Sequence, residues 1–397
     1  MRQFLSLSLL LLASVAQGAP PPVVDNPAEA PAARTVELEK LWEVGGFSDT
    51  PGEFFGKLYT LDVDSQGRVY LLDVQLKEVR VFSPDGRYLR TTSHEGEGPG
   101  ELLRPSGLTL LPGDTLCVLQ TSPPRRSLFD ADGNYTGELP LPGSLFEDAQ
   151  RVTSVRFGGG RLVVGTFAYG AGPGYVDSTT RVYSLAPGDS TAAPFAEFTY
   201  HNEFSEHVVK EAATNPLRWS VGRDGRCALT RGYDYAIEIW SPAGRLERVI
   251  TRDIEHRMRS KAERDSVVAA YRRGGGTEGL DIEVMDHVRD VEWMALREDG
   301  GLWVLSSRGV QAGLDPGCLG TFDCYDAKGR LVEELRLLGE GSLGADRYFL
   351  AGDRLYVLRR YAEAFSTVPE PAEESSDEEP EPMSVICYRL PESPTGR

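Results

Sequence analysis

The sequence predicts an all-β fold, a six-bladed β-propeller of four-stranded antiparallel blades, with one inserted helix and one acidic disordered loop. A strand–turn–strand unit recurs six times along the 397 residues. Four short strands repeated every ~40 to 60 residues are typical of propeller blades. Apolar residues at helical spacing are nearly absent from these units, which disfavours a helical solenoid.

The recurring unit places an aromatic residue a few positions before a turn that contains Gly or Pro. Its first copy, "VRVFSPDGRYLR" at residues 79–90, reads as a strand, a turn and a second strand. The other copies begin at residues 126, 180, 237, 322 and 384, and the aromatic markers are Phe82, Phe129, Tyr183, Trp240, Tyr325 and Tyr388. Successive markers lie 47, 54, 57, 85 and 63 residues apart, so each hairpin is expected to form the outer half of one blade.

The clearest complete blade covers residues 55–93, where Gly, Asp and Pro turns separate four short alternating strands. Residues 36–46, "VELEKLWEVGG", also alternate like a strand, but they precede the first inner strand. Closure of the ring removes exposed sheet edges. We therefore expect this segment to pair with the last strand of the chain as the outer edge of blade six.

The N-terminus predicts export. Residues 1–18 combine Arg2, an apolar run from Leu5 to Val15 and a cleavage site before Ala19, which are the features of a secretory signal peptide. Residues 19–34 are rich in Pro and Ala and predict an extended linker, so the propeller is expected to occupy residues 35–397. We expect a secreted or periplasmic monomer without a transmembrane segment.

Two insertions explain the long spacings between the later copies. Residues 254–276 predict a helical insertion, with Met258 and Tyr271 on the side that should rest against the propeller mouth. Residues 363–383 carry eight acidic side chains, several prolines and no basic residue. Like charges and proline prevent compact packing, so this loop is expected to be disordered.

Residues 45–110 resemble an NHL-type repeat. The segment contains "GEF" at residues 52–54, which precedes an inner strand. The pattern "DSQGRVYLLD" at residues 64–73 follows, then "VRVF" at residues 79–82 with Gly86 four positions after Phe82, and "GEL" at residues 100–102 begins the next copy. The whole chain after the signal peptide is similar to the six-bladed, NHL-like propellers that bacteria export. The resemblance implies the fold and a binding role, without implying a reaction.

Charge and cysteine content narrow the function classes. The formal net charge is −18, which argues against a nucleic-acid partner because phosphate backbones are bound by Lys and Arg. Cys318 and Cys324 could close a small disulfide loop, since export permits disulfides, and a buried free thiol at each position is the alternative. Cys117, Cys227 and Cys387 lie in strand-like runs and are expected to be buried free thiols.

No catalytic constellation stands out in the sequence. The chain lacks the GxSxG, HExxH and P-loop patterns, and no cofactor is predicted. Of the five histidines, His94, His207 and His287 fall in loops that lead into inner strands, where a metal site would need convergent side chains. Their sequence contexts differ, so no metal site is predicted.

A basic residue recurs in the loops that feed the inner strands. The candidates for a ligand-binding ring at the channel mouth are Lys57, Arg104, Arg151, Arg218, Arg289 and Arg347. Corresponding positions of a propeller converge around its axis, where a narrow opening focuses the field of basic groups on an anion. The alternative is that these side chains point outward or pair with nearby acids such as Asp148, Asp290 and Asp346.

Two functions remain open from the sequence. The first is a non-enzymatic binding module for a protein, a glycan or a small anionic ligand, favoured because no catalytic constellation is visible. The second is a channel-centred, metal-dependent hydrolase or lyase, since propellers that resemble this chain include lactonases and an amidating lyase with metals in the channel. Stoichiometric Ca or Zn in the purified protein would favour the enzyme.

Overall fold

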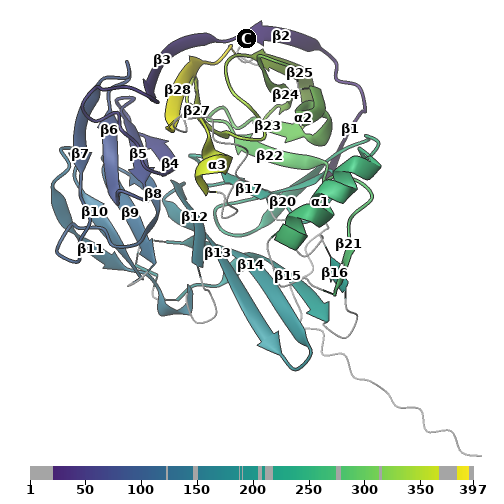
Figure 1. The fold of residues 1–397 in the computed structure, drawn as a ribbon, viewed down its shortest axis with the longest axis horizontal. Helices are drawn as coiled ribbons and strands as arrows, with labels where there is room; N and C mark the ends of the chain where they lie inside the picture. Colours follow the sequence, from purple (N-terminus) through teal and green to yellow (C-terminus); the bar gives the residue numbers. More distant parts are fainter. Residues whose placement is uncertain are drawn as a thin grey trace, which may run out of the picture.

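The computed structural model describes residues 21–121, 124–145, 151–186, 188–189, 191–203, 208–210, 218–273, 279–312, 315–365 and 382–392. Six β-sheets stand in a ring, as Figure 1 shows, and each sheet is one blade. The predicted six-bladed propeller is therefore confirmed. Within each blade the chain runs from the strand nearest the channel outward. Blades four, five and six each receive one further outer strand from the N-terminal segment.

The first three blades follow one another without interruption. Blade one contains β4 (Leu58–Val63), β5 (Val69–Asp73), β6 (Glu78–Phe82) and β7 (Tyr88–Thr92). Blade two contains β8 (Pro105–Leu111), β9 (Thr115–Thr121), β10 (Pro124–Phe129) and β11 (Tyr135–Pro140), followed by the short helix η1 (Gly143–Leu145). Blade three has the longest strands, β12 (Arg151–Gly158), β13 (Arg161–Gly172), β14 (Tyr175–Leu185) and β15 (Pro194–Glu203).

The last three blades complete the ring. Blade four contains β17 (Arg218–Val221), β18 (Cys227–Thr230), β19 (Ala236–Trp240) and β20 (Leu246–Arg252). Blade five contains β22 (Val291–Leu296), β23 (Leu302–Ser306), β24 (Cys318–Tyr325) and β25 (Leu331–Leu338). Blade six contains β26 (Arg347–Ala351), β27 (Arg354–Leu358), β28 (Ser384–Arg389) and β3 (Glu39–Gly45).

The ring is closed by the N-terminal strand, as predicted. β3 pairs antiparallel with β28, and Val44 lies opposite Val385 in the middle of the hydrophobic core that blades six and one share. The indole N–H of Trp42, also on β3, donates a hydrogen bond to the carbonyl oxygen of Pro84 in blade one (2.9 Å). A single segment therefore joins the last blade to the first.

The predicted linker is not a free segment. β1 (Val23–Asn26) pairs in parallel with β20, and β2 (Ala33–Glu37) pairs in parallel with β25. Each adds a fifth strand to the outside of blade four or five, and Figure 1 shows this N-terminal segment running around the outside of the ring. The linker prediction was wrong for these residues because the outer strands β20 and β25 offer unpaired backbone groups that an extended chain can satisfy.

The recurring hairpin has one turn geometry in four blades. In blade one the backbone N–H of Gly86 bonds to the carbonyl of Ser83, and the Ser83 hydroxyl oxygen accepts the N–H of Arg87. Gly86 has a φ of 81° and follows a register shift between Val81 and Phe82, as in a bulged hairpin. Equivalent turns begin at Asp130, Ser241 and Asp326.

The turn glycine also makes the joint between neighbouring blades. A Cβ atom on Gly86 would lie 2.7 Å from the Trp42 ring of blade six. A Cβ atom on Gly329 of blade five would likewise lie 2.8 Å from Ile250 of blade four. The hairpin repeats because each outer turn must fit closely against the outer strand of the preceding blade.

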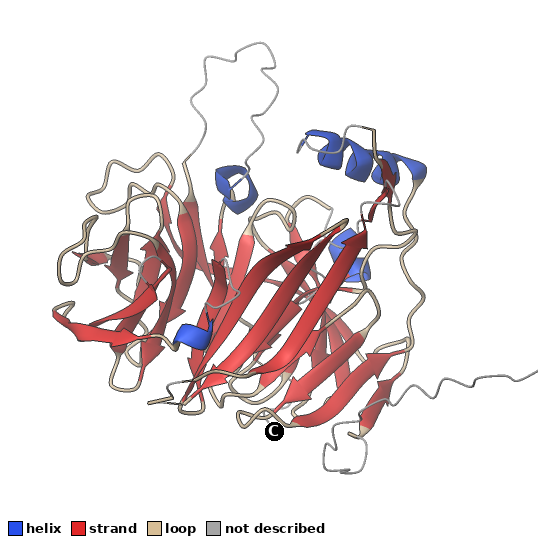
Figure 2. Cartoon of the chain, turned by 90° about the horizontal axis from the view of Figure 1, so that it is seen from below, coloured by secondary structure: helices blue, strands red, loops and turns tan. Residues whose placement is uncertain are grey.

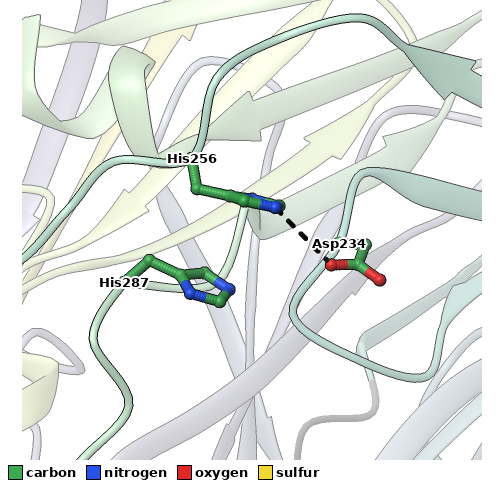
Figure 3. Close-up of side chains that lie close together, drawn as sticks. All are labelled: Asp234, His256 and His287. Carbon is green, nitrogen blue, oxygen red and sulfur yellow. Dashed lines mark ion pairs between the residues drawn. The ribbon is translucent and has the colours of Figure 1, made fainter.

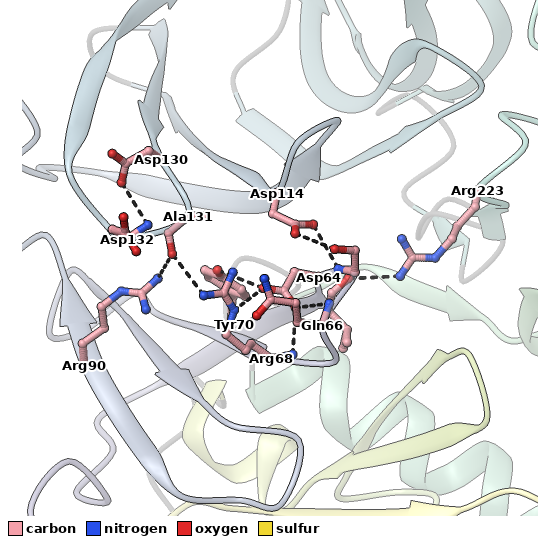
Figure 4. Close-up of polar contacts among 12 residues, drawn as sticks. Asp64, Gln66, Arg68, Tyr70, Arg90, Asp114, Asp130, Ala131, Asp132 and Arg223 are labelled. Carbon is pink, nitrogen blue, oxygen red and sulfur yellow. Dashed lines mark hydrogen bonds and ion pairs between the residues drawn. The ribbon is translucent and has the colours of Figure 1, made fainter.

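Figure 4 shows a second joint, between blades one and two. The Asp64 carboxylate accepts the backbone N–H groups of Gln66 and Arg68 and pairs with the Arg68 guanidinium (2.5 Å). Arg68 and Arg90 then both donate to the carbonyl oxygen of Ala131 in blade two. The Asp-x-x-Gly-Arg pattern of the sequence therefore serves the turn and the contact between blades together.

The helices lie outside the blades. The connections between strands contain α1 (Lys261–Arg273), α2 (Ser307–Ala312), which follows β23, and α3 (Tyr361–Phe365). They also contain a short parallel pair, β16 (Val208–Lys210) with β21 (Asp281–Glu283). In Figure 2, α1 and α3 stand on the same side of the ring. α1 begins later than expected, and Met258 is 61% exposed, so it does not hold the helix against the mouth as predicted.

Several expectations fall outside the described residues. They concern the signal peptide at residues 1–18 and all but the ends of the acidic loop at 363–383. No helix within the described ranges is long and apolar enough to cross a membrane.

Cys318 and Cys324 are both free and buried, which is the second of the two alternatives that the sequence left open. They lie near the two ends of one strand, β24. Six residues of extended chain span about 20 Å, whereas a disulfide needs Cα atoms less than about 7 Å apart. The two thiols therefore stay apart because the segment between them is a strand.

We expect Gly86→Ala to destabilise the protein more than Gly113→Ala. Both glycines have positive φ values, 81° and 77°, so each substitution should cost about 1 kcal/mol of backbone strain. Only Gly86 also faces the Trp42 ring, which should add about 1–3 kcal/mol of overpacking, because nothing lies within 4 Å of the Cβ position of Gly113. Urea unfolding measures both; equal losses would contradict the joint between blades.

Candidate functional site

The predicted basic ring is only partly brought together. Of its six residues, Arg218 and Arg347 line the cavity in the channel. Lys57 lies 5.9 Å from the Phe365 ring, Arg104 is exposed, and Arg289 stacks on Tyr233, and none of these three lines the cavity. The side chain of Arg151 lies outside the described part of the chain. The ring stays a prediction, of which the structure brings two members to the cavity and places three away from it, because the offset between each basic residue and its inner strand varies from blade to blade.

The channel cavity has a volume of about 330 Å³ and lies between the inner strands of blades three to six. β12, β17, β22 and β26 supply its lining residues. Three arginines line it, Arg156, Arg218 and Arg347, together with one acidic residue, Glu292. Trp219, Trp293 and Phe349 are also among the lining residues, so aromatic surface accompanies the positive charge.

Arg156 is the central basic group, and the sequence analysis did not single it out. Its guanidinium donates hydrogen bonds to the Thr60 hydroxyl and to the carbonyl oxygens of Leu108 and Val155, and it lies 5.7 Å from the centre of the Phe349 ring. None of these partners is charged. Arg156 forms no ion pair within the described residues; burial lowers the pKa of Arg156, and the negative charge of the nearby Asp62 opposes that shift.

Arg347 is held at the first position of β26 by aromatic rings. Its guanidinium lies 5.3 Å from the ring centre of Tyr59 and 4.9 Å from that of Tyr361 in α3. It donates hydrogen bonds to the Tyr59 carbonyl oxygen (3.2 Å) and to the Tyr361 hydroxyl. Cation–π contact stabilises a desolvated charge without neutralising it, so Arg347 keeps its full positive charge beside the cavity.

Arg218 stands at the first position of β17. Burial, reinforced by the positive charge of Arg289, lowers the pKa of Arg218 to about 10. Its Nε donates to the backbone carbonyl of Glu292 (3.2 Å). At neutral pH a guanidinium with this pKa is still charged, so Arg218 brings a positive charge to the lining of the cavity.

A smaller cavity continues the channel toward the ends of the inner strands. It shares Arg156 and three further residues with the main cavity, Val221, Leu296 and Leu350. Asp62, Arg223, Arg297 and Glu298 line it as well, so its charge is mixed. The main cavity, with three arginines and one carboxylate, is therefore the more positive of the two.

A second polar cluster combines Asp234, from the loop between β18 and β19 of blade four, with His256 and His287, from the connection between blades four and five. His256 and His287 stack with ring centres 4.3 Å apart, and Asp234 faces His256, as Figure 3 shows. One ligand atom from each of the three side chains lies within 4.8 Å of the other two. The sequence analysis placed His287 in a suitable loop but expected no metal site, and it did not connect His256 or Asp234 with it.

The remaining histidines are separate. His94 pairs with Glu101 (3.1 Å) and His201 with Asp177 (2.6 Å), and each pair is at least partly exposed. His207 lies outside the described residues. The channel cavity itself has no histidine among its described lining residues, so a channel-centred metal site of the kind considered from the sequence has no His ligands there.

No protein-family profile matches the sequence, and no curated protein matches it. Several solved structures have a similar chain trace. One is described as a putative exported protein from Bacteroides fragilis; it has 10% identity over 93% of this chain and 100% of that chain (TM-score 0.49). A member of the DUF4221 family from Bacteroides vulgatus has 8% identity, with 89% of this chain and 97% of that one covered (TM-score 0.49).

Regucalcin, a calcium-binding protein from Agrobacterium tumefaciens, has 14% identity over 92% of this chain and 99% of that one (TM-score 0.43). Identities of 14% and below are too low for a ligand or an activity to be carried over to this chain.

The segment that carries His256 should loosen at acid pH. Glu263 in the first turn of α1 accepts the backbone N–H of Ser260 and an Arg257 hydrogen bond, and these hold the pKa of Glu263 at about 2. Because this pKa lies below the unfolded value, the carboxylate stabilises the helix start above about pH 4.5, and that contribution is lost as the pH falls toward 2.

Amide hydrogen exchange of residues 257–264 should therefore accelerate between pH 5 and about pH 2.5 in the wild type. Glu263→Gln should remove most of that pH dependence, because glutamine does not titrate. A wild-type helix start whose exchange, corrected for intrinsic rates, is the same at both pH values would contradict this assignment.

Proposed function

We propose that the protein is a non-enzymatic binding module that holds a small anionic ligand in the channel cavity. The observation that carries the proposal is the set of three guanidinium groups, Arg156, Arg218 and Arg347, around one cavity with a single lining carboxylate. Buried charges in proteins are normally paired, because an unpaired charge loses its hydration without compensation. Arg156 forms no ion pair within the described part of the chain, and a carboxylate or phosphate group in the cavity would supply one.

The size and walls of the cavity indicate the rest of the ligand. A volume of about 330 Å³ lies at the lower end of the range for small-molecule sites. Trp293 and Phe349 offer flat apolar surface next to the charged groups. We therefore expect a compact metabolite-sized anion with an apolar or ring portion, bound by bidentate hydrogen bonds from arginine.

The way the arginines are held supports binding over a purely structural role. Arg156 and Arg347 are positioned by hydroxyl groups, carbonyl oxygens and aromatic rings, which fix the guanidinium groups but leave their charges available. Preorganised donors of this kind lose little entropy when a ligand arrives. The enzyme alternative has less support in the channel, where Glu292 is the one carboxylate among the described lining residues of the main cavity.

Inorganic phosphate and citrate are suitable probes, with binding measured by isothermal titration calorimetry in a buffer free of both. We expect saturable binding of at least one of them at low ionic strength, and markedly weaker binding in 0.5 M NaCl, roughly the concentration at which salt screens charges beyond a few ångströms. Arg156→Met should weaken it by about 10- to 100-fold, since a hydrogen bond to a charged group contributes about 1.5–3 kcal/mol.

The same variant separates a functional arginine from a structural one. Methionine replaces the buried charge with an apolar side chain of similar length, so Arg156→Met should keep or raise the melting temperature while binding is lost. Arg104→Ala is the matched control, because Arg104 belongs to the predicted ring but is exposed and off the cavity. Equal losses of binding in both variants, or no binding of either probe by the wild type, would refute the cavity as an anion site.

A further inference from the structure

The cluster of Asp234, His256 and His287 has the composition of a transition-metal site. Two imidazoles and a carboxylate converge with their ligand atoms within 4.8 Å of one another. In a tetrahedral zinc site with bonds of about 2.0–2.1 Å, ligand atoms lie about 3.3 Å apart. Small side-chain rotations would close that difference, and Asp234 and His256 are both exposed enough to rotate.

Hydrogen bonding already orients His256. Its Nδ1 lies 3.0 Å from the carboxylate of Asp290, whose side chain is 2% exposed. A carboxylate at Nδ1 fixes the proton there and leaves the lone pair on Nε2, the arrangement usual for metal-binding histidines. Nε2 in turn faces the Asp234 carboxylate at 3.9 Å. A metal ion between these two atoms would be bound by both.

His287 contributes a ring nitrogen that has no hydrogen-bond partner among the described residues. This atom, Nε2, is buried. The ring itself is held between His256 and Tyr233, with ring centres 4.3 and 5.8 Å away. A buried polar atom without a partner costs free energy, and coordination to a metal would remove that cost.

The backbone around the cluster is well fixed. The N–H of Val288 bonds to the carbonyl of Arg257 (3.0 Å), so the two connecting segments that carry the histidines lie side by side. The N–H of Asp290 bonds to the carbonyl of Tyr233 (2.7 Å), which ties the loop of Asp234 to the same place. Tyr235, which follows Asp234 in the sequence, is buried and donates a hydrogen bond from its hydroxyl to the Asp323 carboxylate (2.7 Å), so it anchors this loop.

We propose that Asp234, His256 and His287 bind one divalent transition-metal ion, for which Zn²⁺ is the best match, on the rim between blades four and five. Nitrogen ligands favour zinc over Mg²⁺ and Ca²⁺, which take oxygen ligands. Three protein ligands leave a fourth position open, and the exposure of Asp234 places that position toward solvent. The site is separate from the channel cavity, whose lining contains none of the three residues.

Zinc chloride titrated by calorimetry into protein that has been treated with a chelator and dialysed tests the site. We expect one equivalent of Zn²⁺ to bind with a dissociation constant in the micromolar range or below, and MgCl₂ and CaCl₂ not to compete. His256→Ala and His287→Ala should each weaken binding by at least about 100-fold. Asp290→Asn, which leaves all three ligands in place, should weaken it by about 10- to 100-fold.

His94→Ala is the matched control, because His94 forms a partly exposed His–carboxylate pair with Glu101 but has no second histidine in its cluster. It should bind zinc as the wild type does. Cobalt chloride gives an independent readout, since a tetrahedral Co²⁺ site with nitrogen and oxygen ligands absorbs visible light. Absence of saturable zinc binding, or binding that survives both histidine substitutions in folded protein, would overturn the proposal whatever the outcome of the anion titrations.

Discussion

The whole propeller depends on the pairing of its N-terminal segment with three separate blades. β1, β2 and β3 add to the outer strands of blades four, five and six in turn, so 23 residues of chain hold half the ring together. Asn26 illustrates the join, because its side-chain amide donates to the carbonyls of Thr251 in blade four and Gly329 in blade five. Without this segment the outer strands of blades four to six would be unpaired, and the ring would rely on the contacts between neighbouring blades to stay closed.

The same join supports both candidate sites. Arg252 of blade four forms a buried ion pair with Asp323 of blade five (2.7 Å) and donates to the carbonyl of Ala28 in the N-terminal segment. Burial raises the pKa of Asp323, the Arg252 charge opposes that rise, and the Tyr235 hydroxyl donates to the same carboxylate. Fixing blades four and five to each other fixes the loop of Asp234 and the inner strands β17 and β22 that border the channel cavity.

The fold could be predicted because its repeating signal is local. Ser83 and Gly86 make their own turn within five residues, so the pattern is visible in any one copy. The closing strand was visible too, because it alternates and had no blade of its own. The parallel additions of β1 and β2 were not visible, since short segments rich in proline give no signal for a partner more than two hundred residues away.

The site residues were harder to predict because they depend on side-chain direction and on distant pairing. Arg104 and Arg347 precede their strands in similar contexts, yet only Arg347 lines the cavity. The sequence did contain a signal for Arg156, because it is a charged residue within the alternating pattern of the inner strand β12. His256 precedes the inserted helix α1 in the sequence and His287 follows it, and the backbone pairing of residues 257–259 with residues 286–288 brings them together.

The two candidate sites share a common physical origin in local departures from good packing. Arg156 keeps a charge in the channel without a carboxylate partner among the described residues, and His287 keeps a buried nitrogen without a hydrogen bond. Sequences under selection for stability alone would replace such groups with apolar ones of similar size, because the replacement removes a desolvation cost. Departures from otherwise consistent packing occur most often where a protein binds something. Tyr233 connects the rim cluster with the channel, because it contacts His287 and stacks with Arg289, whose charge adds to burial in lowering the pKa of Arg218.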